Sequence, residues 1–371
     1  MPELLKNIYS LKFFEEYANT MKQVIPGMDK KHFIKQIFDG QWESKELKQR
    51  MRHIATVLKE HLPGNYKKNV SVIIQIIQQL KNNGTKGGFE YLLFPDFIEQ
   101  FGLDDLDTSL KAMEKITQFI SCEFAIRPFL LKYPDEVMLQ MQQWSKHSSP
   151  HVRRFSSEGC RPRLPWAMAI PQLKKDPSPI LPILENLKND SSLFVRKSVA
   201  NNLNDISKDN PGVVIELAKK WKGKTAETDW IIKHGCRTLL KKADDKIYKI
   251  FGLNSSSACT IINLKLDKAR IKIGEQLGFS FHLKLATQEA CKLRIEYLVY
   301  YIKANGNQTK KLFKLTENNF HPGIIYPFKR HQRLQDFTTR KHYPGKHKIG
   351  IIINGKELAV KEFMLLNKTS S

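Results

Sequence analysis

The sequence predicts a mainly α-helical protein in which a HEAT-like helical repeat solenoid, an α-α superhelix, precedes a C-terminal immunoglobulin-like β-sandwich. Apolar residues follow a helical period up to about residue 251, three helical segments resemble one another, and the period changes to two after residue 260. The chain of 371 residues also exceeds what one compact core usually holds. We expect a helical domain at 1–251, a Ser-rich linker at 252–259 and a sandwich at 260–371.

Amphipathic helices account for the first part of the chain. Apolar residues recur at intervals of three and four, as in Leu110, Met113 and Ile116, and again between residues 213 and 221. Pairs that stop or start helices, such as Pro-Gly at 63–64, Asn-Gly at 83–84 and Asn-Pro at 210–211, separate these stretches. The pattern predicts an array of helices and little else before residue 251.

Three segments, 148–159, 191–203 and 227–240, form a repeat. Val152 and Val195 are 43 residues apart and Val195 and Ile231 are 36 apart, close to the period of about 40–47 residues typical of HEAT repeats. A basic residue follows each of these positions, so stacked repeats would form a basic groove. The alternative is that these bases are solvated ends of core helices. The residues concerned are Arg154, Arg196, Lys197 and Lys233.

Half-buried strands are predicted after the linker. The segments 261–267, 279–285, 293–297 and 347–351 alternate, or nearly alternate, between apolar and polar residues. Turn signals such as Asn305-Gly306 and Asn354-Gly355 separate such segments. About seven short strands in this length favour an immunoglobulin-like sandwich.

The charge balance points to a polyanionic partner. The chain has 61 Lys and Arg against 37 Asp and Glu, a net charge of +24, which favours nucleic acid first and an anionic membrane surface second. Between residues 258 and 371 there are 21 basic against 8 acidic residues. We expect the basic clusters there to lie in loops or at strand ends and to contact phosphates, the alternative being scattered solubilising lysines. These clusters are Lys310-Lys311, Lys329-Arg330, Arg333, Arg340-Lys341 and Lys346.

Other classes of protein fit the sequence poorly. Five cysteines without a CxxC pair argue against a disulfide scaffold, and the spacing of His147, His151 and Cys160 matches no common zinc site. The N-terminus shows no secretion signal, and the most apolar stretch, residues 70–80, is interrupted by three glutamines. We therefore expect a soluble cytoplasmic protein with no metal, no other cofactor and no membrane partner.

The stretch from residue 151 to 177 is the most unusual in composition, with four arginines and a tryptophan among several prolines. Prolines at 162 and 165 cannot lie inside a regular helix, so this part predicts a rigid connector after the helix that carries Glu158. The connector would hold Arg161, Arg163 and Trp166 near that helix end. Alternatively, the tryptophan packs between helices and the arginines cap carbonyls.

The run Ser-Glu-Gly-Cys-Arg-Pro-Arg-Leu-Pro-Trp at 157–166, with Val-Arg-Lys at 195–197, resembles the AlkC family of bacterial alkylpurine (3-methyladenine) DNA glycosylases. The resemblance covers nearly the whole chain, because that family joins HEAT-like repeats to an immunoglobulin-like domain. It implies excision of cationic methylated bases from double-stranded DNA without a closed base pocket. It also implies that Glu123, Glu158 and Asp205 are the acids around the lesion.

The chemistry of such a reaction suits carboxylates. A base methylated at a ring nitrogen departs as a neutral group, and the difficult moment is the oxocarbenium-like sugar. We expect Glu158 to contact this sugar, Asp205 or Glu123 to activate water, and strand cleavage to be absent because no Schiff-base lysine is evident. A groove that wraps a duplex needs no second copy, so we expect a monomer. The residues expected to bind DNA or the lesion are Trp166, Arg161, Arg163, Arg154, Arg196, Lys197 and Lys233.

Two other functions remain open from the sequence alone. The first is a non-catalytic HEAT-repeat protein that binds nucleic acid or an acidic protein, in which the acids are structural. The second, a peripheral membrane protein that uses the basic sandwich, is weaker because no basic amphipathic helix with an aromatic face is evident.

Overall fold

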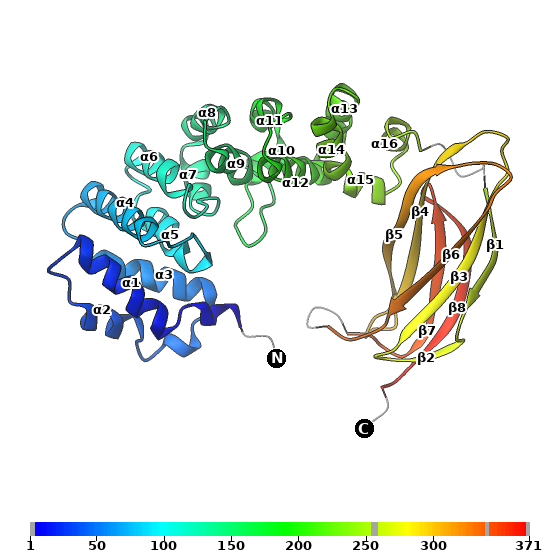
Figure 1. The fold of residues 1–371 in the computed structure, drawn as a ribbon, viewed down its shortest axis with the longest axis horizontal. Coiled ribbons are helices and arrows are strands. Elements are labelled where there is room, and N and C mark those ends of the chain that lie inside the picture. The colour runs from blue at the N-terminus through cyan, green and yellow to red at the C-terminus, as the bar shows by residue number, and fades with distance from the viewer. Residues whose placement is uncertain (1–3, 254–258, 338–340, 369–371) are drawn as a thin grey trace. The chain divides into compact units, whose positions relative to one another are not determined.

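The computed structural model describes residues 4–253, 259–337 and 341–368, which are drawn in Figure 1. The chain divides into two compact units, Met1–Cys236 and Arg237–Ser371. The first unit is helical, and the second begins with two short helices and continues as two β-sheets. The predicted fold class, helices followed by a β-sandwich, is therefore confirmed.

The helices of the first unit begin where the sequence supplies start signals. Ser10 and Asp105 accept a hydrogen bond from the backbone N–H three residues on, and proline occupies the first turn of other helices at 134, 150 and 211. The α-helices are α1 Leu11–Val24, α2 Lys30–Ile37, α3 Leu47–Glu60, α4 Tyr66–Asn82, α5 Leu93–Phe101, α6 Leu106–Ile116, α7 Ile126–Lys132, α8 Pro134–Trp144, α9 Pro150–Gly159, α10 Pro171–Lys175, α11 Leu181–Leu187, α12 Leu193–Asp209, α13 Pro211–Trp221 and α14 Ala226–Gly235; short 3₁₀ turns lie at η1 Leu5–Ile8, η2 Trp42–Ser44, η3 Phe89–Leu92 and η4 Ser178–Ile180.

The three similar segments form equivalent helices, α9, α12 and α14. Helix α12 packs against both of the others, and Figure 1 shows the three in one row with α8, α11 and α13 in a second row. Val152, Val195 and Ile231, which fix the repeat in the sequence, are all fully buried. The repeat in the sequence is thus a repeat of core positions. The basic residue two positions after each of them also occupies an equivalent position in its helix.

The second unit contains two short helices and two sheets. The sheets have the strand orders β1-β3-β6 and β2-β8-β7-β4-β5, with every pairing antiparallel except that of β2 with β8. Eight strands are present among the described residues, where the sequence suggested about seven. The elements are α15 Arg237–Lys241, α16 Asp245–Ile250, β1 Cys259–Leu266, β2 Arg270–Lys272, β3 Gln276–Leu285, β4 Cys291–Ile302, β5 Gln308–Phe320, β6 Ile325–Arg333, β7 Gly345–Ile353 and β8 Lys356–Leu366.

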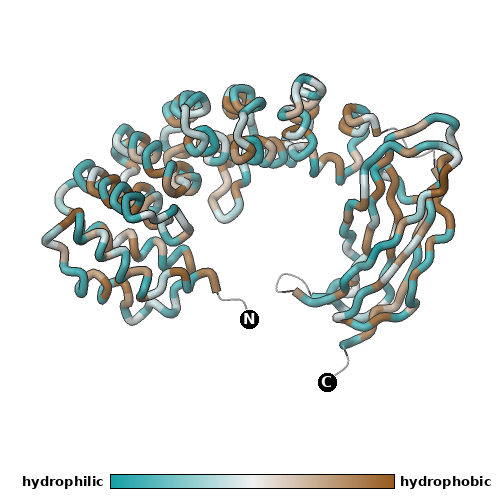
Figure 2. Tube along the Cα trace, in the orientation of Figure 1, coloured by the Kyte–Doolittle hydropathy of each residue, from teal (hydrophilic) through white to brown (hydrophobic). Residues whose placement is uncertain are grey.

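The core of this unit lies between the sheets. Alternate residues such as Phe281, Val299 and Ile351 are buried in it, and Figure 2 shows hydrophobic and hydrophilic residues interspersed along the strands and along the helices of the first unit. The turn at Asn354-Gly355 has positive φ at both residues, 43° and 82°, as a two-residue hairpin requires. Among the described residues, no helix has both the length and the apolar character needed to cross a bilayer.

Helices α15 and α16 belong to the second compact unit, although the sequence pattern placed them at the end of the helical domain. Tyr248 lies with Leu298 and Ile352 in the lining of one cavity, and Lys292 Nζ donates a hydrogen bond to the carbonyl of Phe251 at 3.0 Å. Their helical period alone could not show which unit they pack against. Residues 254–258 of the expected linker lie outside the described residues.

Candidate functional site

Three acids from different parts of the first unit are joined by two arginines. Arg154 Nη1 lies 2.5 Å from Glu123 Oε2, and its Nη2 lies 3.8 Å from Glu158 Oε1. Arg161 Nη1 lies 2.5 Å from the same oxygen of Glu158, and its Nη2 lies 2.7 Å from Asp205 Oδ2. We call these five residues the charged row. It connects the segment before α7 to α9 and α12, so the three acids named from the sequence are brought together.

The inner part of the charged row is buried. Glu158 is 5% exposed, Asp205 is 1% exposed and Arg161 is 6% exposed. Burial tends to lower the pKa of Arg161, but Glu158 and Asp205 outweigh it and hold that pKa above its usual value. The guanidinium is therefore charged and committed to two carboxylates. Each of the three acids expected around the lesion is thus paired with a base.

The three acids differ in how many of their oxygens are engaged. Among the described residues, the contacts of Glu158 fall on Oε1, and those of Glu123 fall on Oε2, which also accepts from Ser121 Oγ at 2.6 Å. Asp205 uses both oxygens, because Lys208 Nζ lies 2.8 Å from Oδ1. Glu158 and Glu123 thus each keep one oxygen outside these contacts, and Asp205 keeps neither.

The segment between α9 and α10 forms a projecting loop that carries Trp166. Figure 1 shows this loop leaving the rows of helices. Trp166 is 60% exposed and has a φ of 65°, a left-handed conformation that is unfavourable for a bulky side chain. Its ring lies 6.4 Å from that of Phe89, and its carbonyl accepts a hydrogen bond from Lys48. The tryptophan is not packed between helices, which was the alternative expected from the sequence.

The basic residues expected to bind DNA fall into two groups, of which the first bonds to backbone carbonyls or to the acids of the charged row. Arg196 donates to the carbonyls of Asp190 and Ser191 at 2.7 and 2.9 Å, six and five residues earlier in the chain. Arg153 makes the same pattern of bonds at the start of α9. The first base of each Val-Arg pair therefore closes the loop before its helix. Arg154 and Arg161 belong to the charged row.

The second group lies closer to solvent. Lys197 is exposed and Lys233 is half-buried, and both occupy the position that Arg154 has in α9. Arg163 makes a two-point contact with Asp209, with distances of 2.8 and 2.6 Å. Because α9, α12 and α14 are neighbours in one row, Arg154, Lys197 and Lys233 follow one another across it. Arg154 is paired with acids of the charged row, and contact of these three residues with DNA stays a prediction.

The basic clusters of the second unit lie mainly on strands. Lys329-Arg330 and Arg333 belong to β6, and Lys310-Lys311 to β5; each strand is at the edge of its sheet. Lys346 is the second residue of β7, and Arg340 lies outside the described residues. The expectation of loops is thus wrong for Lys329-Arg330. Lysines on edge strands also discourage unwanted strand pairing, so they do not by themselves indicate phosphate contacts.

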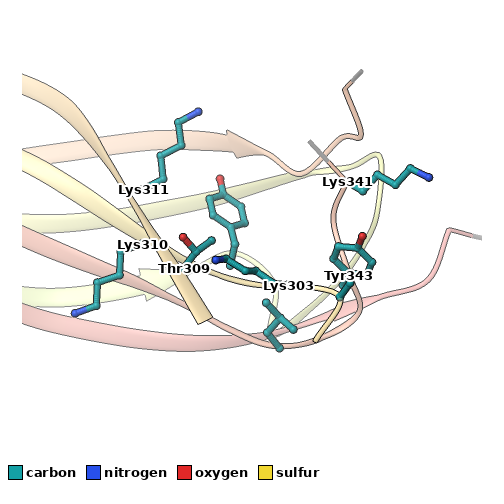
Figure 3. A pocket seen from close by; sticks show the side chains of 9 residues that line it. Lys303, Thr309, Lys310, Lys311, Lys341 and Tyr343 are labelled. Carbon is teal, nitrogen blue, oxygen red and sulfur yellow. The ribbon is translucent and has the colours of Figure 1, made fainter. Parts of the chain in front are cut away.

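A cavity of about 480 Å³ lies beside the turn between β4 and β5. Its lining includes Lys303, Lys310, Lys311 and Lys341. Figure 3 shows Lys310 and Lys311 extending to opposite sides of their strand, while Lys341 extends away from both. The ammonium groups do not converge, so the cavity is not a compact site for an anion.

The charged row offers neither a group of metal ligands nor a reactive thiol. Within the part of the chain that the structure describes, no three His, Cys, Asp or Glu side chains are grouped as metal ligands. Cys160 is buried next to the row, and burial raises the pKa of its thiol to about 12. A thiol in this state is a poor nucleophile.

Sequence reasoning missed several residues around the row. Ser121 bonds to Glu123, Lys48 bonds to the Trp166 carbonyl, and Phe89 lies beside the Trp166 ring. Lys48 is 118 residues from Trp166, so no local pattern could connect them. Ser121 and Arg127 belong to the segment Ser-Cys-Glu-Phe-Ala-Ile-Arg-Pro, in which only the acid was singled out.

Comparison with known proteins agrees with this architecture. A family profile described as "DNA alkylation repair enzyme" matches residues 95–239, and one described as "Uncharacterised protein YhaZ, C-terminal Ig-like domain" matches residues 260–367. The chain is 42% identical to the uncharacterized protein YhaZ of Bacillus subtilis (strain 168) over 352 residues, which is 95% of this chain and 96% of that protein.

A solved structure extends the match to the whole fold. The alkylpurine DNA glycosylase AlkC of Pseudomonas fluorescens, bound to DNA containing an abasic site analog, is 35% identical, with a TM-score of 0.94 over 98% of this chain and 100% of that one. The projecting Trp166 loop and the charged row lie within a fold that both chains share over almost their full length. The chain therefore belongs to the AlkC family of alkylpurine DNA glycosylases.

Proposed function

We propose that this protein is a DNA repair glycosylase that hydrolyses the N-glycosidic bond of cationic alkylated bases, with 3-methyladenine as the typical substrate. The observation that carries the proposal is the charged row, which brings Glu123, Glu158 and Asp205 together where the loop that carries the exposed Trp166 leaves α9. The match to the DNA-bound AlkC of Pseudomonas fluorescens supports DNA as the partner.

In the proposed reaction the bond between C1′ and the base nitrogen breaks, and its electron pair moves to the base. The base ring loses its positive charge and departs neutral, so no strong general acid is needed. The sugar becomes electron-poor, and a carboxylate beside it stabilises this charge. Water attacks C1′ and passes its proton to a second carboxylate. We assign the first role to Glu158 and the second to Glu123, because each has an oxygen outside the contacts of the row.

Asp205 has a different role in this proposal. Both of its oxygens are engaged, and it holds Arg161 on the side opposite Glu158. It therefore fixes the position of Arg161 and, through it, of Glu158. Lys208 is held in an ion pair with Asp205, which disfavours attack on the sugar, and we propose hydrolysis without strand cleavage.

Binding of duplex DNA is assigned to the exposed parts of the first unit. We assign phosphate contacts to the exposed Lys197 and the half-buried Lys233, and contact with an exposed nucleotide to the exposed aromatic face of Trp166. Arg161 is excluded from direct phosphate contact by its two carboxylate partners. We further propose that the protein acts as a monomer in the bacterial cytoplasm.

A second function has one observation in its favour. All three acids have ion-pair partners, and Asp205 is almost completely buried, which is also what a purely structural cluster would show. A non-catalytic repeat protein with such a cluster would bind alkylated and undamaged duplex equally well and would release no base.

The test is release of free 3-methyladenine from methylated duplex DNA under single-turnover conditions. The proposal predicts release well above the spontaneous rate and an intact phosphodiester backbone. Base release at the spontaneous rate, together with equal affinity for damaged and undamaged duplex, would favour the non-catalytic alternative. Cleavage of the DNA strand without added alkali would contradict the hydrolytic assignment.

A further inference from the structure

Arg127, in α7, is a buried arginine that the proposed reaction has not yet used. Its side chain is 0% exposed. Its Nη1 donates to the carbonyls of Gly159 and Arg161, both at 2.9 Å, and its Nε donates to the carbonyl of Met168 at 2.5 Å. All three acceptors belong to the end of α9 and the projecting loop that follows it.

These bonds close the loop at both ends. Gly159 and Arg161 stand where the loop leaves α9, and Met168 stands just after Trp166. One rigid guanidinium therefore joins the two sides of the loop, in the way that a cross-link would. The arrangement limits the backbone of the residues between them, including Trp166 with its left-handed φ.

The same bonds also act on the charged row. The carbonyl of Arg161 is held by Arg127, while the side chain of Arg161 reaches Glu158 and Asp205. Because the backbone of Arg161 is fixed, the point from which its side chain extends is fixed as well. This determines where its guanidinium binds the two carboxylates. Arg127 is thus linked through a single loop to both the acids and the tryptophan.

Arg127 occupies this place at an energetic cost. Its hydrogen bonds in the structure are to neutral carbonyls, and burial lowers its pKa to about 10, with Arg161 contributing in the same direction. The three bonds from Nε and Nη1 offset part of the cost of burying this cation, whereas its buried Nη2 has no hydrogen-bond partner among the described residues. An apolar side chain would fill the space with a smaller desolvation penalty, but it could not donate hydrogen bonds to three carbonyls.

We propose that Arg127 is a positioning residue that holds Trp166 and the Arg161–Glu158–Asp205 cluster in the relative positions that catalysis requires. The inference rests on the glycosylase function proposed above. Lysine cannot replace Arg127, because one ammonium group cannot reproduce the fork that reaches both sides of the loop. Misplacement of reacting groups by about 1 Å can lower a rate by about 100-fold.

The test compares Arg127→Lys with Arg50→Lys as a matched control. Arg50 is also buried, at 3% exposed, and donates to two backbone carbonyls in the same unit, those of Lys6 and Lys45. Each variant is assayed for the single-turnover rate of base release from methylated DNA and for affinity to undamaged duplex. The wild-type chain is assayed in parallel, so that failure of the glycosylase proposal itself is recognised by its lack of base release.

A second readout does not depend on activity. Chains labelled with 5-fluorotryptophan are compared by ¹⁹F NMR, and the Trp166 resonance is assigned by its loss in Trp166→Phe. We expect Arg127→Lys to shift or broaden this resonance while those of Trp144 and Trp221, buried elsewhere in the helical unit, stay in place. General destabilisation would instead alter all three.

The proposal expects Arg127→Lys to lower the single-turnover rate by roughly 10- to 100-fold, with affinity for undamaged duplex within about threefold, while Arg50→Lys keeps the wild-type rate. An unchanged rate and an unchanged Trp166 resonance in folded Arg127→Lys would overturn it. So would a chain that fails to fold with Arg127→Lys but folds with Arg50→Lys, because Arg127 would then be a structural residue. Should the wild type release no base, a shifted Trp166 resonance would still support the loop-positioning part.

Discussion

The substitution Glu158→Gln tests the electrostatic role of the charged row most directly. It removes one negative charge and keeps the size of the side chain. A carboxylate about 4 Å from a developing cation, at an effective dielectric constant of about 20, contributes about 4 kcal/mol. Arg161 is present in both proteins, so its repulsion of the sugar cancels in the comparison.

The lesion is already cationic before the bond breaks, so only part of this energy affects the chemical step. With the ground-state charge on the base ring about 7 Å from Glu158, the attraction there is about 2 kcal/mol. The remaining difference of about 2 kcal/mol lowers the saturated single-turnover rate by roughly 30-fold. When the protein is subsaturating, the rate is measured relative to free protein and free DNA, so the full 4 kcal/mol applies. The rate is then expected to fall by about 1,000-fold.

The fold should survive this change. Arg161 keeps its contact with Asp205 at 2.7 Å, so we expect destabilisation below the roughly 3–5 kcal/mol typical when a buried charge loses its only partner. Glu216→Gln is the matched control, since Glu216 also pairs with a base three residues on, Lys219, but is exposed on α13. Equal rates for Glu158→Gln and wild type in both concentration regimes would refute the electrostatic argument, as would an equal loss in the control.

Three further outcomes are expected. Trp166→Ala should weaken binding to duplex with an abasic-site analogue by about 1–3 kcal/mol, measured by fluorescence anisotropy, and Trp166→Phe should restore most of it; equal affinity for all three chains would contradict the stacking role. Lys197→Ala should reduce the slope of log affinity against log salt by about 1, whereas an unchanged slope would mean that Lys197 contacts no phosphate. Burial and the neighbouring Asp96 raise the pKa of Glu99 to about 6, so the native chain binds this proton more tightly than the unfolded chain and loses stability as pH rises from about 4.5 through 6. Glu99→Gln should therefore gain up to about 2 kcal/mol over wild type above pH 6 and nothing below pH 4.5 in denaturant titrations; a gain that is independent of pH would argue against this titration.

Much of the fold could be predicted because it depends on local periodicity. The residues that repeat in the sequence, Val152, Val195 and Ile231, are core positions of equivalent helices, and the alternating segments after residue 260 became strands. The helices α15 and α16 show where this reasoning stops. A helical pattern predicts that a helix forms, but it does not predict which surface the apolar side of the helix will cover.

The candidate site could be predicted in its members but not in its connections. The resemblance carried by residues 157–166 led to Glu123, Glu158 and Asp205, and the structure brings them together. It also pairs Arg161 with two of these acids and commits Arg196 to backbone carbonyls. An arginine in a sequence shows a charge but not its partner.

The sequence alone determined the two kinds of secondary structure, the repeat and the excess of positive charge, because these properties depend on residues close together in the chain. Only the tertiary structure decided that Glu158 and Asp205 meet at Arg161, that Trp166 stays exposed, and that Arg127 holds both sides of its loop. These contacts join residues that are tens of positions apart. Their geometry is set by how α7, α9 and α12 pack, and no local pattern encodes that packing.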